Sequence, residues 1–308
     1  MYHQTSKDMI PKVLTTKLVE IYFYVCEKFE KDLKFSCQRF TNNDNPEFTD
    51  QEIMTIYLFV ISQEKRFKIK EIYRFTDVYL RSWFPKLPSY AAFNNRLNRL
   101  SEAFKMLTTS LLHDYQPIDC ILQESLLDSL PIVTAHGKRV GKVAPELTDK
   151  GFCSTKSMYF YGLKLHALGF RREKQMPFPE QLLITPASEN DLNVFRNAWS
   201  SIENRTFYGD KIYHNVDYFN NLAATQNAVM LTPVKAIKNQ SEWEKQFDKA
   251  WNDLYSKAVS TVRQPIESFF NWLIEKTDFQ RASKVRSANG LLVHVFGKLA
   301  AAFIYLIF

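Results

Sequence analysis

Cysteine is scarce in this chain, and the placement of its few copies excludes two kinds of site. Four cysteines occur in 308 residues, and no two of them have C-x-x-C spacing. The six histidines are scattered in the same way. A structural zinc site and a disulfide framework therefore have no support in the sequence.

The chain also lacks a recognisable targeting segment. The N-terminal residues MYHQTSKDMIPK have no apolar core of the kind found in signal peptides, so we expect a cytoplasmic protein. The last residues, GLLVHVFGKLAAAFIYLIF, are about long enough to span a bilayer, but they include His294 and Lys298. Because charge is costly inside a membrane, we expect a buried helix that packs on a sheet. A membrane anchor is the alternative.

The composition is that of a globular protein with an excess of positive charge. The chain is long enough for about two domains. It carries 40 Lys and Arg against 33 Asp and Glu, which gives a net charge of +7 and a pI near 9.0. This balance favours a polyanionic partner without identifying one.

Residues 1–115 predict a separate all-helical domain. Apolar residues from Leu14 to Leu33 recur at spacings of three and four, which is typical of one face of a helix. The segment Thr49-Asp50-Gln51-Glu52 has the pattern of a capping box. No long alternating run, which would indicate a strand, occurs in this region.

A further helix of this domain is predicted to begin after Pro88-Ser89. Its apolar residues are expected to face inward: Phe93, Leu97, Leu100, Phe104 and Leu107. Its polar residues are then turned outward: Asn94, Asn95, Arg96, Asn98 and Arg99. Asn and Arg side chains can contact base edges and phosphates, so Asn95, Arg96 and Arg99 are candidate DNA contacts. The solvated outer face of an ordinary bundle helix is the alternative.

From residue 118 the pattern changes to short apolar runs with helices between the later ones. Strands are predicted at 124–133, 160–170, 180–185, 205–210 and 227–234, and helices near 191–202 and 216–227, followed by a final helix. We therefore predict a second domain over residues 116–308. It has a mixed five-stranded sheet with flanking helices, so the domain is α/β and the whole chain is α+β.

Three carboxylates in this second domain have settings of their own. Asp128 in LLDSLPIV and Asp210 in FYGDKIY each follow an apolar run, and Glu267 in RQPIESFF opens a C-terminal helix. Taken singly, each also fits a turn or the first turn of a helix. If separate elements bring the three together, they form an all-oxygen site suited to hard divalent cations such as Mg²⁺.

Several motifs, in order, resemble those of the bacterial insertion-sequence transposases, which carry a DDE triad on an RNase H-like fold. The motifs are Leu-Asp-Ser at 127–129, KSMYFYGLKLH at 156–166, YGDKIY at 208–213 and Arg-x-x-x-Glu at 263–267. The resemblance covers roughly residues 118–300. It implies that Asp128, Asp210 and Glu267 are the catalytic and metal-binding triad, with two Mg²⁺ or Mn²⁺ ions.

The resemblance also implies the activity and the partners. The expected activity is Mg²⁺-dependent cleavage at the terminal inverted repeats of an insertion sequence, followed by transfer of the exposed 3′ end to target DNA. The expected partner is double-stranded DNA, with self-association on the DNA, no membrane contact and a location at the bacterial nucleoid. Two alternatives remain: a transposase-derived DNA-binding protein without activity, and an RNase H-like nuclease without strand transfer.

Basic residues near the motifs are further candidate DNA contacts. Arg263 is predicted to hold a DNA phosphate or to pair with the triad, with a plain surface ion pair as the alternative. Lys164 shares one face of its strand with His166. We expect His166 to be a hydrogen-bonded structural histidine. The segment 135–158 either tracks a DNA backbone or forms a solvated hairpin, and it is basic: Lys138, Arg139, Lys142, Lys150 and Lys156.

The chain departs from the pattern of these transposases at three places. Ser260 and Ile274 replace the tyrosine and lysine that some relatives carry around the Arg-x-x-x-Glu motif, which tells against that branch. Asn190-Asp191 stands where many relatives have His-Asp, so no histidine contact is expected there. Pro265 lies two residues before Glu267, so the helix is predicted to begin or kink at this proline.

Overall fold

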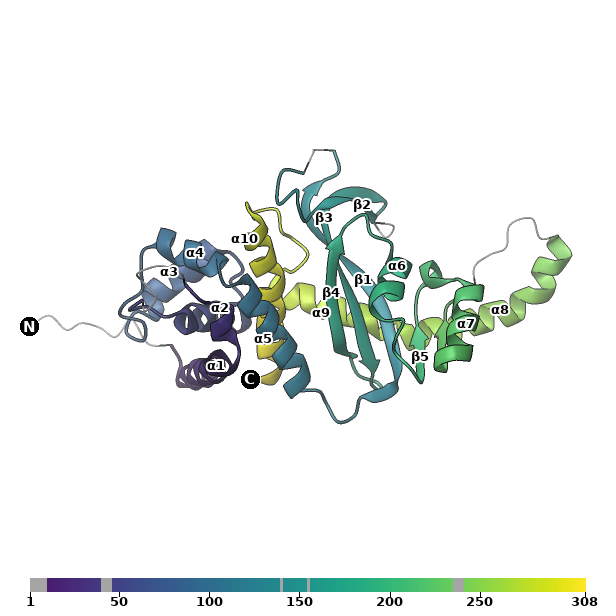
Figure 1. Ribbon diagram of the computed structural model, residues 1–308, viewed down its shortest axis with the longest axis horizontal. Coiled ribbons are helices and arrows are strands. Elements are labelled where there is room, and N and C mark those ends of the chain that lie inside the picture. Colours follow the sequence, from purple (N-terminus) through teal and green to yellow (C-terminus); the bar gives the residue numbers. More distant parts are fainter. Residues whose placement is uncertain (1–9, 40–45, 139–140, 154–155, 235–240) are drawn as a thin grey trace, which may run out of the picture. The chain divides into compact units, whose positions relative to one another are not determined.

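The computed structural model describes residues 10–39, 46–138, 141–153, 156–234 and 241–308 (Figure 1). The chain divides into two compact units. One unit combines residues 1–115 with residues 273–308, and the other consists of residues 116–272. Arg139 of the basic segment lies outside the described residues.

The first unit is helical, as its periodicity predicts. Its N-terminal part contains α1 (Lys12–Lys31), the short 3-10 helix η1 (Leu33–Phe35), α2 (Asp50–Glu64), α3 (Ile69–Tyr79), α4 (Tyr90–Asn98) and α5 (Ser101–Asp114). The predicted capping box is present at α2. The Thr49 hydroxyl accepts a hydrogen bond from the Glu52 amide, and the Glu52 carboxylate accepts one from the Thr49 amide. These two contacts satisfy amides that the first turn of a helix leaves without partners.

The helix predicted after Pro88-Ser89 is interrupted by a turn. Ser89 caps α4 as expected, but α4 ends at Asn98 and α5 begins at Ser101. The five apolar residues expected to face inward are all buried. The polar face is less open than predicted: Asn95 and Arg99 are exposed, whereas the Arg96 side chain is only 16% exposed.

The C-terminal segment forms a buried helix, as predicted, but it packs on helices where we expected the sheet. It consists of α10 (Ala288–Leu292), the π-helical turn η3 (Val293–Gly297) and α11 (Lys298–Ile307), and α11 packs on α2 and α5. A Cβ atom at Gly297 would lie 2.6 Å from a ring carbon of Tyr57 in α2, so only glycine permits this close approach. The prediction of the sheet as partner was wrong because a helix that is apolar on all sides does not specify what it packs against.

The same segment is long and apolar enough to cross a membrane. Among the described residues, Ala288–Ile307 is the one helix that meets this test of length and hydropathy. In the 18-residue stretch of this helix that meets the test, 72% is buried inside the protein. The core helix of a soluble protein passes the same test, and burial of this extent agrees with a core helix.

The second unit is built on a mixed six-stranded sheet. Its strands are β1 (Ile121–His136), β2 (Asp149–Cys153), β3 (Met158–Arg171), β4 (Phe178–Pro186), β5 (Arg205–Tyr208) and β6 (Ala228–Leu231). The order is β2-β3-β1-β5-β6, with β4 paired to β3. The pairs β1–β3, β2–β3 and β3–β4 are antiparallel, and β1–β5 and β5–β6 are parallel. The predicted RNase H-like fold is confirmed, and β2 is a strand additional to the five that were predicted.

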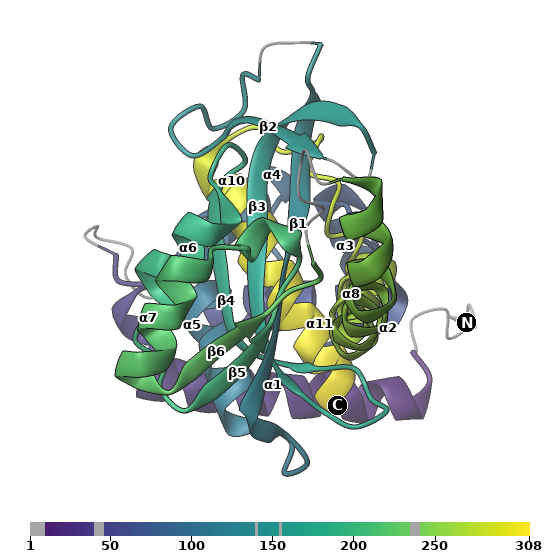
Figure 2. The ribbon, with the colours of Figure 1, turned by 90° about the vertical axis from the view of Figure 1, so that its right-hand side faces the viewer.

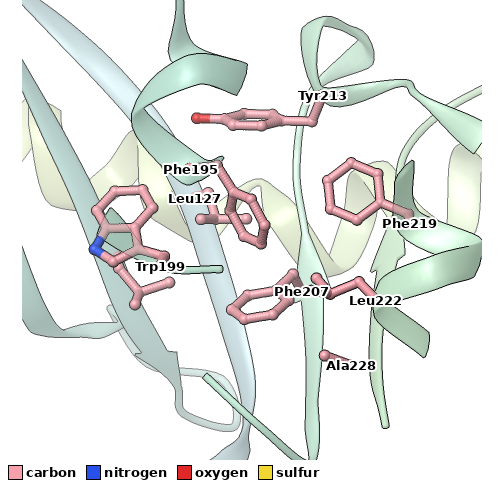
Figure 3. Packing of buried hydrophobic residues seen from close by; sticks show 9 residues of the cluster. Leu127, Phe195, Trp199, Phe207, Tyr213, Phe219, Leu222 and Ala228 are labelled. Carbon is pink, nitrogen blue, oxygen red and sulfur yellow. The ribbon is translucent and has the colours of Figure 1, made fainter. Parts of the chain in front are cut away.

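Helices flank this sheet on both faces. Figure 2 shows α6 (Asp191–Ala198) and α7 (Val216–Gln226) on one side of the sheet and α8 (Glu242–Arg263) on the other. The next helix, α9 (Pro265–Thr277), begins at Pro265, as its sequence predicts. The core beneath α6 and α7 is aromatic (Figure 3). Phe195 of α6 packs edge to face on Phe207 of β5, with 5.0 Å between ring centroids.

Candidate active site

Asp128 and Asp210 lie at equivalent positions on neighbouring strands. Leu126 of β1 pairs with Tyr208 of β5 in parallel register, and each aspartate lies two residues beyond its member of that pair. Parallel strands run in the same direction, so both aspartates are carried to the same side of the pairing region. Each carboxylate also accepts the amide of the next residue, Ser129 for Asp128 and Lys211 for Asp210.

Gly209 allows the chain to turn tightly before Asp210. A Cβ atom at this position would lie 2.7 Å from Cδ2 of Tyr213, closer than side chains approach one another. The short helix η2 (Lys211–Tyr213) follows directly, and Asp210 caps it. The Tyr-Gly-Asp sequence therefore fixes both the position of the carboxylate and the packing of the tyrosine three residues later.

Arg263 joins Asp128 to Glu267. Its Nη1 donates to Asp128 Oδ2 at 2.8 Å, and its Nη2 donates to Glu267 Oε1 at 2.6 Å. Arg263 is the last residue of α8, and Glu267 lies in the first turn of α9. A guanidinium group presents its donors in a fixed fork, so it holds the two carboxylates on either side of one positive charge. Arg263 therefore pairs with two of the three carboxylates predicted to form the triad.

Burial has the largest influence on the titration of Asp128, and neighbouring charges modify it. Burial raises the pKa of Asp128 to about 6. Arg263 opposes this rise, whereas Asp210 and Asp191 add to it. Burial alone would lower the pKa of Arg263, but Asp128 and Glu267 raise it. Asp128 is thus a carboxylate whose ionised form is costly without a nearby cation.

A second group of polar residues lies beside Asp128, centred on Asp191. Asp191 Oδ2 accepts the Ser129 hydroxyl at 2.8 Å, and Asp191 Oδ1 accepts Lys164 Nζ at 3.0 Å. Lys164 also donates to the Glu189 carbonyl at 2.7 Å. Asp191 opens α6, and Asn190 caps that helix by accepting the Leu192 amide. Asp191 is therefore tied directly to β1 and β3, whereas Asn190 only caps α6.

His166 has the structural role that its sequence setting indicates. Its Nε2 lies 2.8 Å from Thr185 Oγ1 on β4, and its side chain is fully buried. Burial lowers the pKa of His166 to about 4, although Asp191 opposes this effect. His166 is therefore neutral at pH 7.

The six candidate DNA contacts differ in exposure. Asn95, Arg99 and Lys156 are exposed. The Lys164 and Arg263 side chains are each 15% exposed and are bonded to carboxylates. The prediction that Arg96 faces outward was wrong, because its side chain turns back to an ion pair with Asp50 at 2.8 Å. The structure places these residues in two separate units and tests no DNA contact.

Asp191 and Tyr213 lie near the predicted site residues, but no definite role could be predicted for either. Asp191 was visible only as the aspartate of Asn190-Asp191, and Tyr213 only as the last residue of the YGDKIY motif. Only 1% of Tyr213 is exposed, and it belongs to the core cluster in Figure 3.

The three predicted triad carboxylates fit a divalent cation by their chemistry. All are oxygen donors, and Asp128 and Glu267 already share one cationic group. In the described part of the chain, no group of three or more His, Cys, Asp or Glu side chains converges closely enough to hold a metal ion. Glu267 is 52% exposed on the first turn of its helix, so its side chain has room to turn toward the two aspartates.

Comparisons with known proteins gave one match. The model of a family described as "Transposase DDE domain" matches residues 123–304, which is more than half of the chain. No curated protein and no solved structure matches the chain.

Proposed function

Because the chain belongs to the transposase DDE domain family, we propose that it binds the terminal inverted repeats of an insertion sequence and cuts and joins DNA strands there. The observation that carries the proposal is the position of Asp128 and Asp210, each two residues beyond a paired residue of the neighbouring parallel strands β1 and β5. Arg263 ties Glu267, the third carboxylate, to Asp128. The three acidic residues come from β1, the turn after β5 and the start of α9, and 139 positions separate the first from the last.

In this proposal, Mg²⁺ or Mn²⁺ ions would be held by three carboxylates, those of Asp128, Asp210 and Glu267. When bound, such ions activate the attacking oxygen of a phosphodiester displacement and stabilise the leaving oxygen. The protein's own contribution is to place Asp128 and Asp210 two residues beyond paired strand positions and to link Glu267 to Asp128 through Arg263. Arg263 offsets part of their charge in the free protein. Its guanidinium could instead hold a DNA phosphate when the carboxylates have other partners.

We assign the DNA contacts outside this site to the helical unit. A polar cavity of about 130 Å³ in this unit is lined by three arginines, Arg39, Arg96 and Arg99, and by Asp50. Arg39 and Arg96 both donate to Asp50 Oδ1. The cavity is therefore lined by three arginines and one carboxylate, and the excess positive charge suits a phosphate of the DNA backbone.

The finer parts of the proposal follow from the same family membership. A transposase must hold two DNA ends, so self-association on DNA is proposed, with activity in the bacterial cytoplasm at the nucleoid. The net charge of +7 supports association with DNA.

The experiment that tests the proposal is end cleavage on labelled inverted-repeat DNA in Mg²⁺, with Ca²⁺ as a binding-competent, inactive control. Asp210→Asn keeps the size of the side chain and its acceptor for the Lys211 amide but removes one charge. DNA binding should survive, and cleavage should fall by about 3 orders of magnitude or more, some 4 kcal/mol. Cleavage within tenfold of wild type would remove Asp210 from the site and the DDE assignment with it.

The same assay separates the alternative functions. Cleavage without joining of the exposed 3′ end to a second DNA would identify a nuclease. Binding of the repeats by the wild type without any cleavage would identify a DNA-binding protein that has lost activity.

A further inference from the structure

The hydroxyl of Tyr213 is a buried polar group of this unit that has no role in the proposed cleavage reaction. Tyr213 ends η2, three residues after Asp210, and only 1% of it is exposed. Its ring lies against Gly209 and packs edge to face on Phe195, with 6.5 Å between centroids (Figure 3). Because the ring is held on both sides, the position of the hydroxyl is fixed as well.

This hydroxyl has no hydrogen-bond partner among the described residues. Buried tyrosine hydroxyls normally find one, because an unpaired polar group away from water is costly. Two more buried atoms of the site share this condition, His166 Nδ1 and Arg263 Nε. His166 Nδ1 lies 3.8 Å from Asp191 Oδ1, beyond hydrogen-bond distance. A buried polar atom without a protein partner indicates a position for an ordered water molecule or another oxygen ligand.

The charges around the hydroxyl are those of the candidate active site. Burial raises the pKa of Tyr213 well above its usual value, and Asp191, Asp128 and Asp210 raise it further, in that order. The hydroxyl therefore stays protonated at working pH and is a hydrogen-bond donor within the negative field of these carboxylates.

We propose that the Tyr213 hydroxyl donates a hydrogen bond to a water molecule held against the carboxylates of Asp128 and Asp191, and so sets the affinity of the site for a divalent cation. Tyr213 is a positioning residue in this proposal, since it acts through the water and the carboxylates. The inference rests on the proposed function, because it assumes that Asp128 takes part in cation binding. Neighbouring groups of this kind orient metal ligands, and their loss typically weakens binding or activity by about 10- to 100-fold.

Ring packing alone is the competing explanation for an aromatic side chain at this position, and the variant Tyr213→Phe separates the two explanations. The variant keeps the ring and its contacts with Phe195 and Gly209 and removes only the hydroxyl. Since that hydroxyl has no partner in the described protein, the melting temperature without metal should be unchanged or higher. Mn²⁺ affinity, measured by titration calorimetry without DNA, should fall by about 10-fold or more. Cleavage at subsaturating Mn²⁺ should fall in parallel and recover in part at high Mn²⁺.

Tyr73→Phe is the matched control. Its hydroxyl donates to the Pro88 carbonyl at 2.9 Å within the helical unit, so its removal should lower the melting temperature and leave Mn²⁺ affinity unchanged. Wild-type Mn²⁺ affinity in Tyr213→Phe would overturn the inference and leave the proposed function intact. A Tyr213→Phe variant that fails to fold would also overturn it, because the hydroxyl would then have a structural partner. Wild-type protein that binds no Mn²⁺ would overturn both the inference and the proposed metal site.

Discussion

The two units of this chain differ in the balance of their clustered charges. In the helical unit, Lys28 pairs with Asp114 at 2.6 Å, and Asp50 accepts both Arg39 and Arg96. In the sheet unit, the carboxylates of Asp128, Asp191, Asp210 and Glu267 lie around Arg263 and Lys164. The charge clusters of the helical unit contain at least as many cations as carboxylates, whereas the cluster of the sheet unit contains fewer cations than carboxylates.

This difference separates charges that support the fold from charges kept for chemistry. A buried ion pair whose members satisfy each other adds little that a ligand could change. A group of carboxylates without enough cations is costly in the free protein, and a bound cation removes that cost. A charge imbalance of this kind is typical of functional sites, where side chains are not arranged for stability alone.

The largest expected effect comes from neutralising the most crowded carboxylate. Asp128→Asn should lower the cleavage rate by about 3 orders of magnitude or more. The same variant should increase the free energy of unfolding by about 1 to 3 kcal/mol at pH 7. The stability gain follows from the raised pKa of about 6. The wild-type folded state then binds more protons than the unfolded state between about pH 4 and pH 6, so wild-type stability falls as pH rises through this range.

Urea unfolding of wild type and Asp128→Asn at several pH values, without metal, measures this effect. The two curves of unfolding free energy should diverge between pH 4 and pH 6, with the variant the more stable above pH 6. Saturating Mg²⁺ should reduce the gap by stabilising the wild type alone. A variant less stable than wild type at pH 7 would show that Asp128 supports the fold, and the contrast between the two units would fail.

The opposite result is expected in the helical unit. Asp50→Ala leaves Arg39 and Arg96 without their shared carboxylate, and both arginine side chains are less than 20% exposed. The variant should lose about 3 to 5 kcal/mol of unfolding free energy, measured by urea denaturation. Glu102→Ala, which breaks an exposed pair with Lys105, is the control and should change stability little. A loss no larger than that of the control would mean that solvent already compensates the Asp50 cluster.

Much of the fold could be predicted from the sequence because its patterns are local. The five predicted strands are all present, and the strand order places Asp128 beside Asp210. The strand β2 escaped prediction because the segment DKGFC has no alternating apolar pattern. Its central Gly151 is required by tertiary structure, since a Cβ atom there would lie 2.3 Å from the Ala187 carbonyl oxygen.

The rest of the site depends on long-range contacts that a local pattern does not contain. Helical periodicity predicts the face of the helix on which Arg96 lies. It does not predict that the long Arg96 side chain reaches back to Asp50. Asp191 reads locally as the first residue of a helix, and its bonds to Ser129 and Lys164 bring in two other strands. The C-terminal helix was predicted to be buried from its composition, whereas its packing on α2 and α5 depends on the tertiary structure.

Lys298 differs from the paired buried charges of the helical unit, and it should have a smaller, pH-dependent effect on the free energy of unfolding. It is buried without a carboxylate partner among the described residues, and its Nζ donates to the Asp278 carbonyl at 2.9 Å. Burial lowers the pKa of Lys298 to about 7, which Asp278 partly opposes. Burial also lowers the pKa of neighbouring His294, to about 3, so this histidine stays neutral in the range considered.

The unfolded chain therefore binds more protons than the folded chain above about pH 7, and Lys298 makes stability rise with pH. The slope should reach about 1.4 kcal/mol per pH unit between about pH 7 and pH 9. Lys298→Met should remove most of this slope, whereas the exposed Lys105→Met should keep it. Parallel wild-type and Lys298→Met curves of unfolding free energy against pH would show that Lys298 titrates normally.

The smallest expected effect concerns Arg99, the exposed arginine of the Asp50 cavity. Arg39 and Arg96 are held by Asp50, so replacing either changes the fold as well as the charge. Arg99 is exposed and lines the same cavity, so Arg99→Ala tests the charge alone. If Arg99 contacts one phosphate, the variant should bind inverted-repeat DNA with a log-log salt dependence shallower by about 0.9, at unchanged melting temperature. Arg74 is an exposed arginine of α3 that does not line the cavity, so Arg74→Ala should keep the wild-type slope.

Equal slopes for wild type and Arg99→Ala in gel-shift titrations would show that the cavity is a structural ion cluster. The balanced charges of the helical unit would then belong wholly to its fold, and the DNA contacts would have to be sought on other basic side chains.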